Sequence, residues 1–209
     1  MRSYESLVQT LHQFAEKAKD KPLTVGEALD TLDEAGYAFI CIILVLPFLQ
    51  PIPLGPFTVL GGIAFGTLGW QLLRGHESPI LPKKILAIEF NEKTWRMLVK
   101  VCIEILGLCR KISKPRYPLI AEGRRGQKIG GFILLAAGGL MAIPFGVLPF
   151  NNFLPGLAIL FYCIGELEDD GLMYLIAFFW LIITVIYFAV FFFALWYFGE
   201  KALAFFNIR

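Results

Sequence analysis

The sequence predicts an all-α integral membrane protein whose core is an internal repeat of two proline-broken helical hairpins. Two stretches of 37 residues, Tyr37 to Leu73 and Ile129 to Gly165, contain no charged residue, and prolines cluster inside both. A third uncharged stretch, Gly171 to Gly199, contains no proline. A mean hydropathy of +0.66 with 17% charged residues lies outside the range of soluble domains. We therefore expect a single membrane domain over residues 1–209.

The first part of that domain, residues 1–36, is polar and predicts interfacial helices. It has no apolar segment that would serve as a cleavable signal peptide. A short helix is expected over residues 3–19, with Leu7, Val8, Leu11 and Phe14 on one face. Thr24 and Glu27 have the spacing of a capping box, in which each side chain bonds the other residue's backbone N–H at the start of a second helix.

The first broken hairpin is predicted over residues 37–73. The ten residues from Tyr37 to Leu46 would form about 15 Å of helix, half of a hydrocarbon core of about 30 Å. Four prolines then forbid a continuous helix: Pro47, Pro51, Pro53 and Pro56. The simplest interpretation is a re-entrant hairpin, and two tight full spans are the alternative. Gly62, Gly66 and Gly69 would let the return helix approach a neighbour closely.

Residues 74–128 predict a basic cytoplasmic connector, because thirteen Lys and Arg residues face five Asp and Glu residues there. A helix over residues 83–112 has Trp95, Leu98, Cys102, Ile105, Cys109 and Ile112 at helical spacing and should rest on the membrane or the protein. Seven basic residues follow in a run: Arg110, Lys111, Lys114, Arg116, Arg124, Arg125 and Lys128. This run either is a topology signal that touches anionic lipid headgroups or binds the pyrophosphate of a lipid-linked sugar.

The second broken hairpin, residues 129–170, resembles the first. A shift of 96 positions places Pro53 on Pro149, Phe57 on Phe153 and Gly69 on Gly165, so we interpret the two as a duplication; parallel and inverted orientations both stay open. Its structural breaks are Pro144, Pro149 and Pro155. A full transmembrane helix is expected over residues 171–200, anchored by Trp196, Tyr197 and Lys201. The N-terminus and the connector would face the cytoplasm and Arg209 the periplasm.

Five segments of the sequence resemble the ExoD family of exopolysaccharide-synthesis membrane proteins: TVGEALDTLDEAGY, LPFLQPIPLGPFTVLGG, QLLRGHESPILP, IPFGVLPFNNFLPGLAIL and GELEDDGL. The resemblance covers roughly residues 20–200. It implies a multi-pass protein of the bacterial cytoplasmic (inner) membrane that affects exopolysaccharide production, and it implies no particular biochemical activity. The bulky Phe150-Asn151-Asn152-Phe153 turn departs from the family's pattern. A weaker likeness, in architecture only, is to DedA-type proteins with paired re-entrant hairpins.

Candidate substrate-binding residues are the amides at the two breaks, Gln50, Asn151 and Asn152. At membrane depth they could hydrogen-bond a sugar, a phosphate or a coupling ion, or they could simply cap the half-helices. Glu166, in the acidic turn with Glu168, Asp169 and Asp170, is the candidate for proton or cation coupling; the alternative is a solvated turn.

Nothing in the sequence indicates an enzyme, a cofactor, a metal site or a nucleic-acid surface. Two functions stay open. We favour transport or scrambling of a lipid-linked saccharide, a lipid or a small solute at the paired breaks. The alternative is a non-transporting accessory or regulatory protein of the polysaccharide-assembly machinery. The expected partners are the lipid bilayer, a lipid-linked saccharide or anionic lipid, and polysaccharide-assembly proteins; the oligomeric state is left open.

Overall fold

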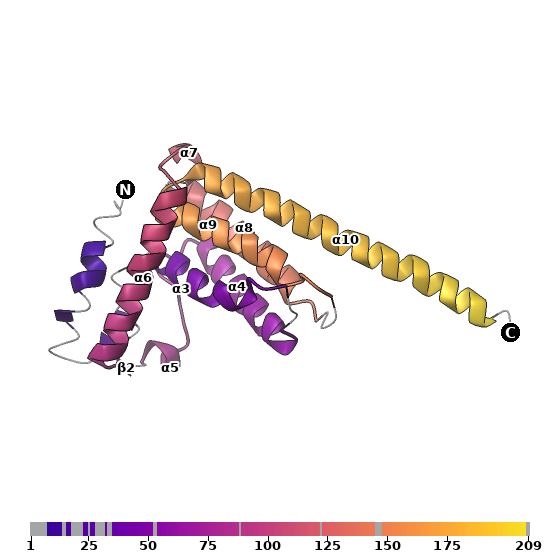
Figure 1. Cartoon of the computed structure of the whole chain (residues 1–209), viewed down its shortest axis with the longest axis horizontal. Coiled ribbons are helices and arrows are strands. Elements are labelled where there is room, and N and C mark those ends of the chain that lie inside the picture. The colour runs from indigo at the N-terminus through magenta and orange to yellow at the C-terminus, as the bar shows by residue number, and fades with distance from the viewer. Residues whose placement is uncertain are drawn as a thin grey trace.

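The computed structural model describes residues 8–13, 16–17, 23–24, 26–27, 32, 35–51, 54–87, 89–121, 123–144 and 148–207, and within them the fold is helical apart from one short strand pair (Figure 1). The elements, in chain order, are β1 (Leu23–Thr24), α3 (Ala35–Val45), η1 (Leu46–Phe48), α4 (Pro56–Leu73), α5 (Lys83–Leu86), β2 (Glu89–Phe90), α6 (Glu92–Ile112), α7 (Pro118–Ala121), α8 (Gly123–Met141), α9 (Phe153–Leu167) and α10 (Gly171–Asn207).

Four helices form two hairpins, α3–η1–α4 and α8–α9, which lie side by side. Helix α4 packs against α8, and α3 packs against α9. The two loops at the breaks, which we call the tips, meet at one end of this bundle: the Phe150 N–H donates to the Pro51 carbonyl. Both hairpins therefore point the same way, and the opposite end of the bundle, where α9 joins α10, is called the base.

The α4–α8 contact depends on glycines that face each other across the two helices. A β-carbon at Gly62 would lie 2.6 Å from the Gly138 carbonyl oxygen, and one at Gly69 would lie 2.6 Å from the Gly131 carbonyl oxygen. Because real β-carbons do not approach so closely, any larger residue would push the helices apart. The predicted role of Gly62 and Gly69 in close packing is confirmed.

The N-terminal segment and α6 lie beside the hairpins (Figure 1). Leu11 and Leu32 are buried in the common hydrophobic core. The capping box is confirmed: the Thr24 N–H donates to Glu27 Oε2 at 3.0 Å, and the Glu27 N–H donates to Thr24 Oγ1 at 3.2 Å. Leu7 and Phe14 of the predicted first helix lie outside the described residues.

Helix α6 is shorter than the predicted helix over residues 83–112. Only α5 forms at its start, and Asn91 begins α6 as an N-cap, with its Oδ1 accepting from the Thr94 N–H at 2.9 Å. The prediction missed this cap. The buried face of α6 is rotated slightly from the predicted one: Val99 and Leu106 are buried with Trp95, Cys102 and Cys109, whereas Ile112 is 51% exposed.

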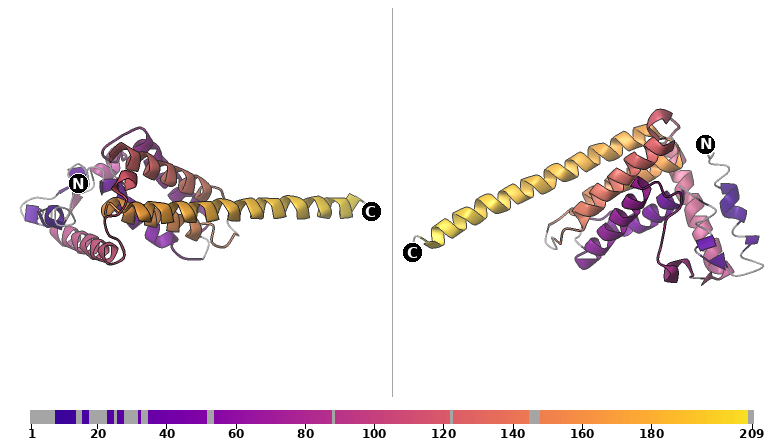
Figure 2. Two further views of the ribbon diagram at one scale, coloured as in Figure 1. Left: turned by 90° about the horizontal axis from the view of Figure 1, so that it is seen from above. Right: turned by 180° about the vertical axis from the view of Figure 1, so that it is seen from behind.

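Helix α10 is the longest element and leaves the bundle (Figure 2). It starts at the base, and the Tyr187 hydroxyl donates to the Pro149 carbonyl where it passes the tips. Beyond that point the ribbon of α10 extends away from the other helices (Figure 2), and although Phe188 is still buried, Phe193, Trp196 and Phe198 are more than 60% exposed. Two described helices are long and apolar enough to cross a bilayer: α4, and α10 from Gly171 to Phe198.

Three boundaries differ from the sequence prediction. Helix α8 begins at Gly123 rather than 129, so Arg124, Arg125 and Lys128 belong to a helix and not to the connector. Pro155 is not a break, because it lies in the first turn of α9, where a missing N–H costs nothing. Helix α10 continues to Asn207 rather than ending near residue 200. Pro53 lies outside the described residues.

Candidate functional site

The tips contain the predicted amides, and the structure brings two of the three together. Asn152 is fully buried, and its Nδ2 donates to the carbonyls of Phe48 and Gln50, each at 3.2 Å. These carbonyls are among those that lose their helical partners where α3 and η1 end. Asn152 therefore ties the second tip to the end of the first half-helix.

This arrangement differs in detail from the cap that the sequence suggested. Asn152 occupies the N-cap position of α9 but makes no side-chain hydrogen bond to its own helix. Gln50 takes part through its backbone carbonyl, and its side chain is half-buried. Asn151 is 3% exposed. A residue-by-residue prediction could place these amides at the breaks, but it could not identify a partner about 100 positions away.

The space beneath the first tip is filled by Phe48. Its ring packs edge-on against Phe65, with 6.1 Å between the ring centroids, and it lies against the Cα of Gly61. The Phe48 carbonyl is the one that Asn152 binds, so this residue uses both its ring and its backbone to close the tip. The described part of the two breaks is thus closely packed.

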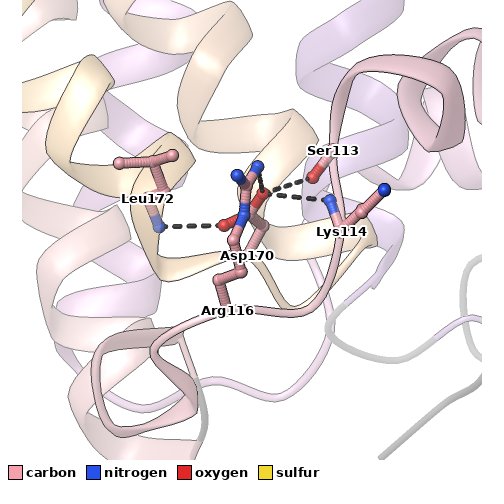
Figure 3. Close-up of polar contacts among 5 residues, drawn as sticks. All are labelled: Ser113, Lys114, Arg116, Asp170 and Leu172. Atoms are coloured by element: carbon pink, nitrogen blue, oxygen red, sulfur yellow. Dashed lines mark hydrogen bonds and ion pairs between the residues drawn. The ribbon is translucent and has the colours of Figure 1, made fainter.

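At the base, the acidic turn is centred on Asp170 (Figure 3). Its Oδ2 accepts from the Ser113 hydroxyl at 2.9 Å, the Lys114 N–H at 3.1 Å and an Arg116 guanidinium nitrogen at 2.9 Å, and its Oδ1 accepts from the Leu172 N–H at 3.0 Å. The Asp170 side chain is fully buried, whereas that of Arg116 is 41% exposed. The Gly171 N–H also donates to the Arg116 carbonyl at 2.6 Å.

These bonds make Asp170 the residue that fixes the connector after α6 to the start of α10. Burial alone would oppose ionisation of this carboxyl, but the donors from Arg116, Lys114, Ser113 and Leu172 hold the pKa of Asp170 below its ordinary value. At Glu168 burial dominates and raises the pKa of the carboxyl, although Arg110 opposes the shift. The predicted alternative of a solvated turn is wrong for Asp170 and Glu168, which are 0% and 8% exposed.

Glu166, the predicted coupling residue, lies on the last turn of α9 and is half-buried. The Tyr174 hydroxyl of α10 donates to Glu166 Oε2. Tyr162 packs edge-on against Tyr174, with 5.6 Å between the ring centroids, and its buried hydroxyl has no hydrogen-bond partner among the described residues. Glu166 therefore joins an aromatic cluster between α9 and α10.

Sequence reasoning missed a third polar contact, which involves Gln71 and Tyr37. Gln71 Nε2 donates to the Ile80 carbonyl at 2.9 Å, and the Ile80 N–H donates back to Gln71 Oε1 at 2.7 Å. The Tyr37 hydroxyl donates to the Ser78 carbonyl at 3.0 Å. Together they hold the segment after α4 against both arms of the first hairpin. An amide in the uncharged stretch of α4 was the signal that could have indicated this contact.

The basic run gathers at the base. Six of its seven members are exposed, namely Arg110, Lys111, Lys114, Arg124, Arg125 and Lys128, and the seventh, Arg116, is paired with Asp170. No group of three or more His, Cys, Asp or Glu side chains suited to a metal ion occurs within the described ranges.

The described chain has paired helical hairpins with joined tips, a base fixed by Asp170 and a long apolar terminal helix. These features define an all-α protein with helices long and apolar enough to cross a membrane. The chain belongs to the family described as "Exopolysaccharide synthesis, ExoD", whose model matches residues 7–190. The resemblance found in the sequence is thereby confirmed.

Two curated relatives are similar over most of their length. The chain is 35% identical over 191 residues to "Protein ExoD" of Rhizobium meliloti (strain 1021), which covers 90% of this chain and 78% of that protein. It is 26% identical over 160 residues to "Uncharacterized protein slr1875" of Synechocystis sp. (strain ATCC 27184 / PCC 6803 / Kazusa), with 77% and 74% coverage. No solved structure matches the chain.

Proposed function

We propose that this protein acts in exopolysaccharide synthesis as an integral protein of the bacterial cytoplasmic membrane, with its base at the cytoplasmic face. The family description and the name of the Rhizobium relative support the process. The exposed apolar side chains of α4 and α10 support the membrane, since soluble monomers rarely expose contiguous apolar areas of this extent. The exposed cations at the base support the orientation.

In this placement α10 crosses the bilayer and the hairpins are re-entrant. The apolar part of α10, Gly171–Phe198, has 28 residues and would be about 42 Å long, which matches a bilayer of about 40–45 Å with its headgroups. Tyr187, which contacts the second tip, lies sixteen residues after Gly171, or about 24 Å along that helix. The tips would therefore end near the middle of the membrane.

The biochemical role that this geometry supports best is that of a non-transporting accessory protein of the polysaccharide-assembly machinery. The observation that carries this proposal is Asn152, whose buried amide is bonded to two carbonyls of the other hairpin. A transport site at the tips would have to expose such groups to its substrate. Here the Asn152 N–H groups and the Phe48 and Gln50 carbonyls are already bonded to each other, which lowers the cost of placing them at membrane depth.

Transport or scrambling of a lipid-linked saccharide, a lipid or a small solute is the second candidate. It is favoured by the position of the tips, because α4 and α9 both begin there and helix N-termini attract phosphate and carbonyl oxygens. In this role the junction between Asn152 and the first tip would open during each cycle.

Reconstitution separates the two roles. Purified protein is placed in liposomes with fluorescent phospholipid or lipid-linked sugar, and transbilayer movement is measured by quenching from outside. The accessory role predicts the same rate as in protein-free liposomes. A clear acceleration that is lost in Gln50→Leu, a variant expected to keep the fold, would contradict it and establish transport at the tips.

A further inference from the structure

The base carries a charge distribution that the proposed function does not by itself explain. Two carboxylates of the acidic turn are turned inward, since Asp170 is fully buried and Glu168 is 8% exposed, whereas Glu166 and Asp169 are half-buried. The six cations named above lie on the outside of the same end of the molecule. The outer surface of the base therefore carries an excess of positive charge, because the cations are exposed while the acidic turn is largely withdrawn from that surface.

These cations come from three elements that the structure holds together. Arg110 and Lys111 end α6, Lys114 lies in the connector, and the others occupy the first two turns of α8. Asp170 binds the connector at Ser113, Lys114 and Arg116, so the end of α6 is fixed beside the start of α10 (Figure 3). Figure 1 shows α6, α7, α8 and α10 meeting at this end.

Large apolar side chains are interleaved with the cations. Leu108, Ile112, Tyr117 and Leu119 are between 51% and 79% exposed, and all lie on the end of α6, the connector or α7. A purely aqueous surface gains nothing from such residues. Cations beside exposed aliphatic and aromatic groups are typical of a surface that enters the headgroup layer of a membrane.

We propose that the base is a docking surface for the phosphates of anionic phospholipids in the cytoplasmic leaflet, with Arg124, Arg125 and Lys128 as its principal contacts. The proposal rests on the membrane placement given above. Arg124, Arg125 and Lys128 lie in the first two turns of α8, so the positive end of the helix dipole adds to the attraction that their charges exert on a phosphate. Each cation near an anionic surface contributes about fivefold in affinity, so three together contribute about 100-fold.

The test uses the full chain, purified in a mild detergent and incubated with phosphatidylglycerol or phosphatidylcholine, and it measures retained lipid by native mass spectrometry. We expect the wild type to retain phosphatidylglycerol preferentially and this preference to weaken with salt. In the triple variant Arg124→Gln, Arg125→Gln, Lys128→Gln the preference for phosphatidylglycerol over phosphatidylcholine should be lost. The control variant Lys93→Gln, Arg96→Gln, Lys100→Gln removes three exposed charges of α6 away from the base and should retain it.

Equal retention of the two lipids, or equal loss in the control variant, would overturn the docking surface. Saturable binding of a polyprenyl pyrophosphate that phosphatidylglycerol does not displace would overturn the assignment to phospholipid. Alkaline carbonate washing of membranes separates this failure from that of the proposed function: a protein that is washed off has no membrane placement, whereas one that stays but shows no lipid preference lacks only the docking surface.

Discussion

Replacing Asn152 by leucine distinguishes a structural tie from a ligand site at the tips. Leucine keeps the number and branching of the side-chain heavy atoms but removes both donors, so the Phe48 and Gln50 carbonyls lose the bonds of 3.2 Å that they now make. A buried carbonyl left without its partner costs about 1–3 kcal/mol, and the bond to Gln50 is only partly buried, so we expect Asn152→Leu to lower the free energy of unfolding by about 2–5 kcal/mol. Asn152→Asp should act similarly, because it keeps the shape and removes the donors.

Gln50→Leu is the matched control for this prediction. The contact with Asn152 uses only the backbone carbonyl of Gln50, so changing its side chain should alter stability by less than about 0.5 kcal/mol. Unfolding in mild detergent, followed by circular dichroism, measures both variants. If Asn152→Leu unfolds at the same point as Gln50→Leu, the amide is not a structural tie and the reasoning from its two bonds fails.

Two further predictions concern the base and the helix contact. Asp170→Asn should cost about 2–4 kcal/mol, because hydrogen bonds to an ionised group are worth about 1.5–3 kcal/mol and the exposed part of Arg116 is solvated. Folding lowers the pKa of Asp170, so its contribution to stability is complete above the unfolded pKa of about 3.9 and is lost as the pH falls through the lower folded pKa. The difference in stability between wild type and variant should therefore close only in acid. A difference that does not depend on pH would argue against an ionised Asp170. On α8, Gly138→Ala should destabilise the protein, because its β-carbon would lie 2.5 Å from the Gly66 nitrogen. The adjacent Gly139→Ala is the control: its β-carbon meets nothing within 4 Å, so it should be neutral or stabilising by up to about 1 kcal/mol. Equal melting temperatures of the two variants would exclude close packing at Gly138.

The features that sequence could predict are those set by local chemistry. The clustered prolines predicted both breaks correctly: α3 ends at Val45, just before Pro47, and α8 ends at Met141, just before Pro144. The capping box at Thr24 was correct because both of its bonds lie within four residues. The long uncharged stretch after Gly171 predicted α10.

The features that sequence could not predict depend on partners far along the chain. Asn152 was correctly placed at a break, but its partners lie in the other hairpin. In the acidic turn the sequence favoured Glu166, and only the fold shows that the connector binds Asp170 instead. The charges of Arg124, Arg125 and Lys128 suggested a connector, yet at a membrane surface the first turns of a helix accommodate charge readily.

The depth of the tips is the central claim of the proposed membrane placement, and cysteine labelling tests it directly. All four native cysteines are buried, so a single introduced cysteine can be labelled with a membrane-impermeant maleimide in the otherwise unchanged protein. The informative positions are Lys111 at the base, Phe150 at the tip, where the side chain is 43% exposed, and Lys201 beyond the apolar part of α10.

In intact cells we expect the reagent to label Lys201→Cys from outside and Lys111→Cys only after the membrane is permeabilised. Phe150→Cys should resist the reagent under both conditions, because a tip in hydrocarbon excludes the water in which thiolates react. Labelling of Phe150→Cys from outside, as efficient as that of Lys201→Cys, would show that the hairpins span the bilayer and would contradict the re-entrant placement.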